Sequence, residues 1–247
     1  MPIDPQGSIA LLIGISAFPK DPKNFPDLLE VQHNVDDLQK VLLDEKIVGF
    51  TDVRPLVNEN SDVIGHAVMK AAEAAEDTLF LYYAGHGIVK SGHFYLTGSN
   101  SIEEAIAFSG IKFETLSQAI NRSPARRKIL ILDSCFSGRA IQDMASGSGI
   151  IEANIDELEG GFTLASAGKS QTAPAISPSG RYTGFTDVLL TVLREGLEPA
   201  KEWISLQEFC DEVKKGASRR PGLPKPVSRF TEEIAGSSCF ETRNTRR

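Results

Sequence analysis

The chain has 247 residues, of which 41% are hydrophobic and 24% are charged, as in an ordinary soluble globular protein. Its net charge of −7 gives no basic surface for phosphates, so nucleic acid is not expected as a partner. No run approaches the roughly 20 apolar residues of a membrane span, and the first apolar run lacks the basic region of a signal peptide, so no membrane partner is expected.

The apolar patterns predict alternating strands and helices along the chain. Strands are predicted at residues 8–16, 52–57, 78–87, 129–132 and 162–167. Helices are predicted at residues 31–43, 61–74, 111–120, 185–193 and 205–215, and a small hairpin at residues 90–98. Ser61 is the predicted N-cap of its helix, and Ser205 and Glu208 have the spacing of a capping box.

This order predicts an α/β fold, a three-layer α/β/α sandwich around a mostly parallel sheet of about six strands. Prolines predict a loop at residues 17–29 and an extended segment after residue 220, which Phe230 and Phe240 are expected to hold against the core. The chain has no internal repeat and no linker. We therefore expect a single domain over residues 1–247, with a core from about residue 8 to 243.

Two of the predicted strands end in residues that can carry chemistry. The strand at residues 129–132 stops at Asp133 and is followed by Cys135, and the strand at residues 78–87 places His86 between two glycines. Open α/β sheets place their active sites at the carboxyl ends of strands. His86 precedes Cys135 by 49 positions, which leaves room for the crossover that neighbouring parallel strands need. We expect His86 and Cys135 to face each other.

A cysteine beside a histidine is suited to nucleophilic catalysis. The imidazole of His86 would activate the Cys135 thiol and protonate the leaving group. The backbone N–H groups of Gly87 and Cys135 are the candidate donors to the oxyanion that forms. In the alternative, Cys135 is a buried structural thiol and His86 a loop histidine, but small polar residues and glycines surround both, which a core cysteine does not need.

The stretches Tyr82-Tyr-Ala-Gly-His-Gly87 and Asp133-Ser-Cys-Phe-Ser-Gly138 resemble the two active-site motifs of the caspase–metacaspase superfamily of cysteine peptidases. The cysteine motif is closer to the Asp-Ser-Cys form of metacaspases and bacterial caspase-like proteins than to the form of animal caspases. The resemblance covers about residues 8–243 and is most similar to bacterial stand-alone or effector-associated members. It implies Cys135 as nucleophile and His86 as general acid and base.

The position two residues before Cys135 bears on specificity. Animal caspases have Gln there and bind a substrate aspartate, whereas metacaspases have Asp and cut after basic residues. Asp133 therefore implies Arg or Lys at P1, the substrate residue before the cut. The second pocket acid of metacaspases aligns with Asn34, and Asp36 or Asp37 takes that place in a shifted register. The alternatives are that Asp133 caps nearby amides and that P1 is Asp.

The resemblance also implies that the substrate pairs with the strand edge at Ala165, Ser166 and Ala167. The loop at about residues 139–161 corresponds to a segment that this family often cleaves or rearranges on activation, but its composition fits an ordinary surface loop equally well. Arg139, Lys169 and Arg181 are candidate self-cleavage sites. The acidic residues 156–159 are more typical of a solvated face than of a metal site, so no cofactor is expected, with calcium as a candidate activator.

These observations predict a regulated cysteine endopeptidase that resembles bacterial proteins of cell death and anti-phage defence. The candidate activators are a partner protein and a diffusible nucleotide or other small signalling ligand. The three cysteines, Cys135, Cys210 and Cys239, are odd in number and widely spaced, which favours a reducing cytoplasm. The alternatives are a non-catalytic adaptor or pseudo-protease with the same fold and a thiol hydrolase or transferase of other acyl groups.

Overall fold

The computed structural model describes residues 2–136, 158, 161–166, 176–197, 203–230, 234, 236 and 238–241, with the backbone alone at 135, 136 and 238–241. Apart from Leu158 and Gly161, the loop predicted at residues 139–161 lies outside these residues. None of the helices described is both long enough and apolar enough to cross a membrane.

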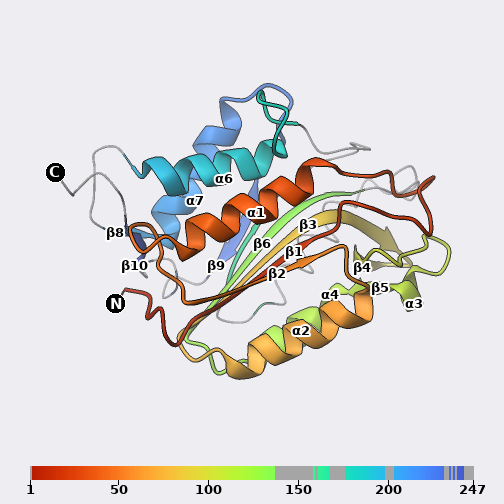
Figure 1. The fold of residues 1–247 in the computed structure, drawn as a ribbon, viewed down its shortest axis with the longest axis horizontal. Helices are drawn as coiled ribbons and strands as arrows, with labels where there is room; N and C mark the ends of the chain where they lie inside the picture. The colour runs from red at the N-terminus through yellow and green to blue at the C-terminus, as the bar shows by residue number, and fades with distance from the viewer. Residues whose placement is uncertain are drawn as a thin grey trace.

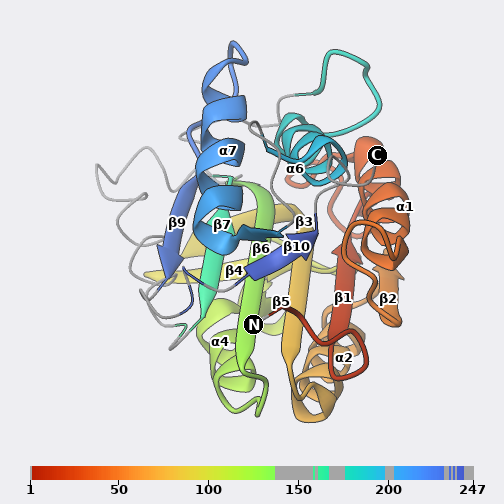
Figure 2. The ribbon, with the colours of Figure 1, turned by 90° about the vertical axis from the view of Figure 1, so that its left-hand side faces the viewer.

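The main sheet is mostly parallel and has helices on both faces (Figure 1). Its strand order is β2 (Asp52–Val57), β1 (Ile9–Gly14), β3 (Thr78–Lys90), β6 (Arg127–Phe136), β7 (Phe162–Ala165) and β9 (Val227–Phe230). Figure 2 shows these strands side by side, from β2 at one edge to β9 at the other. Along this order all neighbours are parallel except β7 and β9. Two further strands, β4 (His93–Thr97) and β5 (Gly110–Lys112), join the same sheet antiparallel beside β3, so in the described part of the chain it has eight strands where about six were predicted. The predicted three-layer α/β/α architecture is confirmed.

The helices form the two outer layers (Figure 1). One face of the sheet carries α1 (Glu30–Leu43), α6 (Gly184–Glu195) and α7 (Leu206–Ser218), and the other carries α2 (Ser61–Ala74) and α4 (Phe113–Asn121). These five correspond to the predicted helices, while the short α3 (Ile106–Ser109) and the strand β5 (Gly110–Lys112) were not predicted. The capping box at Ser205 and Glu208 is confirmed at the start of α7.

Helix α2 begins at Ser61 as predicted, but its cap differs from the prediction. The N-cap residue is Asn60, and Ser61 is the first helical residue. The Ser61 hydroxyl donates instead to the carbonyl of Ser109, at 2.6 Å. The Ser61 hydroxyl, which the sequence suggests as a helix cap, therefore makes a hydrogen bond to a distant residue in place of capping.

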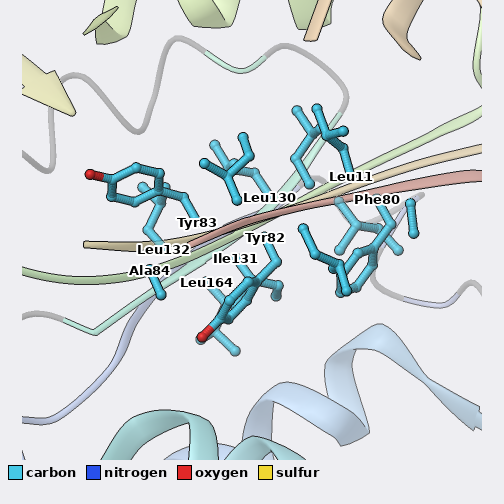
Figure 3. Packing of buried hydrophobic residues seen from close by; sticks show 14 of the residues in the cluster. Leu11, Phe80, Tyr82, Tyr83, Ala84, Leu130, Ile131, Leu132 and Leu164 are labelled. Atoms are coloured by element: carbon cyan, nitrogen blue, oxygen red, sulfur yellow. The ribbon is translucent and has the colours of Figure 1, made fainter. Parts of the chain in front are cut away.

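The central strands are buried on both faces, which explains their continuous apolar runs. Every residue of β1 is buried, as are the first eleven positions of β3. Figure 3 shows Tyr83, Leu130 and Leu132 on one face of the sheet and Tyr82 and Ile131 on the other. This packed sheet holds the carboxyl ends of β3 and β6 in place.

The sequence predicts that the strand ends at the histidine motif, but β3 does not end there. It continues to Lys90 and forms an antiparallel hairpin with β4 (His93–Thr97). The turn consists of Ser91 and Gly92, with φ of 53° and 79°. A turn with two positive φ values matches the twist of the strands it joins, so the hairpin itself is confirmed. His86 consequently lies within a strand that passes from the parallel sheet into the hairpin.

The proline-rich region near the C-terminus ends in strands. β9 pairs antiparallel with β7, and the ring of Phe230 stacks on that of Phe162 with 5.5 Å between centroids. A separate pair is formed by β8 (Trp203–Ser205) and β10 (Ser238–Glu241). The expectation that Phe230 holds this segment against the core is confirmed, while the Phe240 side chain is outside the described atoms.

Candidate active site

The backbones of the two motifs lie side by side where β3 leaves the parallel sheet and β6 nears its end. These strands pair in parallel register, with His86 opposite Cys135 and Gly87 opposite Phe136. The prediction that the two strands are neighbours is confirmed. The crossover between them consists of the β3–β4 hairpin, α3, β5 and α4.

The imidazole of His86 is fully buried against the loop that follows β1. Its ring centroid lies 4.8 Å from that of Phe18 and 5.7 Å from that of Phe25. Its Nε2 lies 2.7 Å from the carbonyl oxygen of Pro26. A carbonyl can only accept a hydrogen bond, so Nε2 carries the proton and Nδ1 has the lone pair. Nδ1 has no partner among the described side chains, which do not include that of Cys135.

Burial favours the neutral form of this imidazole. It lowers the pKa of His86, and the Pro26 carbonyl and the Asp27 carboxylate, which favour the charged form, offset only part of that effect. A neutral imidazole with a free Nδ1 is able to accept a proton from a thiol. The loop that the prolines predict therefore has a defined role, since it fixes the tautomer and orientation of His86.

The backbone of His86 is also held. Its carbonyl accepts hydrogen bonds from the Tyr83 hydroxyl at 2.8 Å and from the Thr97 hydroxyl at 3.0 Å. Gly85 makes room for the first of these, because a Cβ there would lie 2.6 Å from the Tyr83 hydroxyl oxygen. The glycine before the histidine is therefore a steric requirement of this contact.

Asp133 lies within β6, two residues before Cys135, and is only 5% exposed. Its Oδ2 accepts hydrogen bonds from the hydroxyls of Thr183 and Thr186, the latter at 2.5 Å. Burial raises the pKa of Asp133, and the two threonine hydroxyls counteract the rise only in part. The described hydrogen-bond partners of its carboxylate are hydroxyls and the Thr186 backbone, and no cation is among them.

Asn34 meets Asp133 through Thr183. The amide Nδ2 of Asn34 donates to the Thr183 hydroxyl at 2.9 Å, and the Thr183 backbone N–H donates to the Asn34 side-chain oxygen at 3.2 Å. The structure thus brings together the two polar residues that the sequence singles out for the P1 pocket. Thr183 and Thr186 were missed, because hydroxyls at the start of a helix carry no signal of such a distant contact.

Asp37, on the next turn of α1, forms an ionic cluster. Its carboxylate accepts hydrogen bonds from Lys40 at 2.6 Å, Arg181 at 2.9 Å and the Tyr182 hydroxyl at 2.6 Å. Burial raises the pKa of Asp37, but these donors outweigh that effect and hold it well below its ordinary value. Arg181 and Tyr182 belong to a hairpin at residues 176–183, closed by a bridge between Ile176 and Thr183. The cluster therefore attaches this hairpin to α1 beside Asn34.

The predicted substrate edge is only partly described. Ala165 pairs with Leu132 of β6 on one side and with Val227 of β9 on the other. The Ser166 N–H donates to the Leu132 carbonyl at 2.8 Å. Ala165 therefore offers no open strand edge in this structure, and Ala167 lies outside the described residues.

The remaining histidines are not part of this site. His93 lies 2.6 Å from the Glu114 carboxylate through its Nδ1, and His33 and His66 lie on α1 and α2. Within the described part of the chain, no three His, Cys, Asp or Glu side chains are grouped to hold a metal ion. The acidic residues at 156, 157 and 159 are outside that part.

Comparison with known proteins identifies the class. The family model of the caspase domain, a family of C14 peptidases, matches residues 8–232, and the chain belongs to this family. The search of curated proteins found no significant match.

Among solved structures, the chain is similar to protein GSU0716 from Geobacter sulfurreducens, with a TM-score of 0.64 at 18% sequence identity. The alignment covers 93% of this chain and 97% of the other. At this level of identity the likeness supports the fold alone.

Proposed function

We propose that the protein is a cysteine endopeptidase in which Cys135 is the nucleophile and His86 the general acid and base. The observation that carries the proposal is the register of β3 and β6, which sets His86 opposite Cys135. The Pro26 carbonyl adds to it, because it leaves the Nδ1 lone pair of a neutral imidazole available. Membership of the caspase domain family supports a polypeptide as substrate.

The reaction then follows from the chemistry of these two groups. Nδ1 of His86 takes the thiol proton while the sulfur of Cys135 attacks the scissile carbonyl. The N–H groups of Gly87 and Cys135 donate to the oxyanion of the tetrahedral intermediate. The imidazolium returns its proton to the leaving amine as the C–N bond breaks, which leaves a thioester. Water, deprotonated by the same Nδ1, hydrolyses the thioester and restores the thiol.

We further propose that the enzyme cuts after Arg or Lys. Asp133 lies two residues before the nucleophile, and a carboxylate there attracts a basic P1 side chain and repels an acidic one. In this structure Thr183 and Thr186 bond to that carboxylate. Because Asp133 is buried with these hydroxyls against it, we propose that the hairpin at residues 176–183 moves when substrate binds and admits the basic P1 side chain.

The resemblance to bacterial caspase-like proteins also leads us to propose a regulated cytoplasmic enzyme that acts in cell death or anti-phage defence. An activating protein, calcium or a diffusible nucleotide signal would release its activity. Bacterial cells that express the wild-type chain or Cys135→Ala would be challenged with phage. We expect the wild type alone to limit phage growth, and equal protection by Cys135→Ala would exclude proteolysis as the cause.

Covalent labelling tests the nucleophile directly. A peptidyl chloromethyl ketone with Arg or Lys at P1 should label the wild-type chain, and mass spectrometry should locate the adduct on Cys135. The same reagent with Asp at P1 should react more slowly. Labelling of Cys210 or Cys239 in place of Cys135 would reject the assignment, and preferential reaction of the Asp reagent would reject the basic P1 pocket.

A further inference from the structure

The hydroxyl of Tyr83 lies between β3 and β4 at His86. It lies 2.8 Å from the carbonyl oxygen of His86 and 2.9 Å from that of Thr97, to either of which it can donate, and it accepts from the Thr97 backbone N–H at 3.0 Å. The Thr97 hydroxyl donates to the same His86 carbonyl at 3.0 Å. The neighbouring pair of the hairpin is Gly87 opposite Leu96, so His86 and Thr97 would be the next pair of the ladder. The Tyr83 hydroxyl replaces a direct strand-to-strand hydrogen bond at that point.

These contacts determine how one peptide unit is oriented. The His86 carbonyl and the Gly87 N–H belong to the same planar trans peptide, so they point in opposite directions. At Gly87, β4 lies along one edge of β3 and β6 along the other, since Gly87 pairs with Leu96 and with Phe136. The two hydroxyls hold the carbonyl toward β4. The Gly87 N–H is thereby directed toward β6, where the parallel register gives it the Cys135 carbonyl as acceptor until an oxyanion takes that place.

We infer that Tyr83 and Thr97 are positioning residues that orient and polarise the oxyanion-binding N–H of Gly87. The inference rests on the proposed function, because it assumes that Gly87 and Cys135 form the oxyanion site. Donors on a peptide carbonyl strengthen the hydrogen bond that the N–H of the same peptide makes. Tyr83 and Thr97 would act only through the peptide of His86 and Gly87, without binding substrate themselves.

Two further observations fit this role. Tyr83 is almost completely buried, and burial raises its pKa well above the ordinary value, so the hydroxyl keeps its proton as a donor. Gly85 leaves the space that the Tyr83 hydroxyl occupies, since an added Cβ would approach its oxygen to 2.6 Å. Both glycines of the Gly-His-Gly sequence then serve one purpose, with Gly85 admitting the hydroxyl and Gly87 supplying the N–H.

The test compares Tyr83→Phe, Thr97→Val and Thr97→Ser with the wild type. Tyr95→Phe is the matched control, because Tyr95 is a buried tyrosine on β4 outside the contacts of His86. Three quantities are measured: kcat and KM for a cleaved peptide, the Kd of a peptide aldehyde, and the rate at which iodoacetamide alkylates Cys135. The aldehyde adds the thiol across its carbonyl and needs the oxyanion site, whereas alkylation forms no oxyanion.

We expect Tyr83→Phe and Thr97→Val each to lower kcat by about 10- to 100-fold, since loss of an oxyanion donor costs up to about 1,000-fold. KM should stay within about twofold, because the lost interaction exists only in the transition state. The aldehyde Kd should rise in parallel with the loss in kcat, and the alkylation rate should stay within about threefold of the wild type. Thr97→Ser, which keeps the hydroxyl, should restore kcat, and Tyr95→Phe should match the wild type.

The inference is overturned if Tyr83→Phe keeps its kcat, if alkylation falls as far as kcat, or if Tyr95→Phe shows the same loss. If Tyr83→Phe does not fold, as judged by circular dichroism, Thr97→Val and Thr97→Ser decide the matter. Failure of the proposed function gives a different result, in which the wild type shows no cleavage that depends on Cys135, and the positioning role is then rejected with it.

Discussion

His86 and Cys135 are register partners on adjacent parallel strands, one at the point where β3 enters a hairpin and the other near the end of β6. Each strand is fixed by its burial in the sheet, so the separation of the two backbones is set by the fold and not by a loop. The imidazole is oriented independently, by the Pro26 carbonyl and the rings of Phe18 and Phe25. Such preorganisation is what a nucleophile and base pair requires.

The pH dependence of catalysis should reflect the burial of His86. Burial lowers its pKa, so the imidazole is neutral at pH 6.5 and becomes protonated only at lower pH. We expect the acid limb of kcat/KM to lie below pH 6.5, the ordinary value for histidine. His86 should also make folding stability fall as pH falls through 6.5, because the unfolded chain then binds a proton at this histidine more readily than the folded protein does. An acid limb above pH 6.5 in a kcat/KM profile would contradict a buried neutral His86.

Gly85 should tolerate no side chain. Gly85→Ala places a Cβ 2.6 Å from the Tyr83 hydroxyl oxygen and 2.9 Å from Cζ of its ring. Overpacking of this kind costs about 1–3 kcal/mol, and displacement of the hydroxyl should also reduce kcat. Gly65→Ala on α2 is the control, because its Cβ meets nothing within 4 Å and alanine favours a helix by about 0.5–1 kcal/mol. In urea unfolding, Gly85→Ala should lower the free energy of unfolding and Gly65→Ala should raise it. Equal effects of the two substitutions would refute the close contact at Gly85.

Asp37 should stabilise the hairpin at residues 176–183. Asp37→Asn keeps the shape but removes the charge that Lys40 and Arg181 neutralise, so about 2 kcal/mol of unfolding free energy should be lost at pH 7. The folded-state pKa is lowered, so this stabilisation is complete above about pH 4 and declines as pH falls below it. The difference between variant and wild type should therefore shrink between pH 4 and pH 2. A difference that is constant or grows in acid would contradict the cluster's role.

Asp133 should behave in the opposite way. Burial raises its pKa, so its ionised form costs stability as pH rises through the folded-state value. Asp133→Asn should therefore have a larger free energy of unfolding than the wild type at pH 7, whereas Asp37→Asn should have a smaller one. Its kcat/KM for an Arg peptide should nevertheless fall by at least about 30-fold, because the substrate cation loses its partner. A variant that keeps its activity on Arg peptides would show that Asp133 supports the fold and does not bind P1.

The sequence predicts the sheet, the five longer helices and the position of the two motifs because these follow from local patterns. Buried strands require continuous apolar runs, and the capping box at Ser205 and Glu208 is a contact over three residues. The contacts that define the site are not local. Thr183 meets Asn34 across 149 positions, and the Pro26 carbonyl meets His86 across 60.

The differences between the predicted and the observed elements also come from contacts that are not local in the sequence. Ser61 is displaced from the capping position because its hydroxyl bonds to Ser109, 48 residues away. β3 passes His86 without stopping because β4 continues the ladder and the Tyr83 hydroxyl fills the gap between the strands. Glycine and histidine in the motif favour a strand end when seen alone, and the partner strand overrides that preference.

Cleavage of fluorogenic peptides tests the catalytic pair of His86 and Cys135 and the preference for a basic P1 residue most directly. The peptides differ only at P1, with Arg, Lys or Asp, and are tested in the presence and absence of calcium. Cys135→Ala and His86→Ala are compared with the wild type, and His93→Ala serves as the control histidine, since its exposed pair with Glu114 contributes at most about 1 kcal/mol. We predict cleavage after Arg and Lys by the wild type and His93→Ala, and a loss of at least about 10,000-fold in the other two variants. Cleavage that survives Cys135→Ala or His86→Ala would contradict this catalytic pair, and a wild type that cuts none of the peptides with or without calcium would point to a missing activator or to the adaptor alternative.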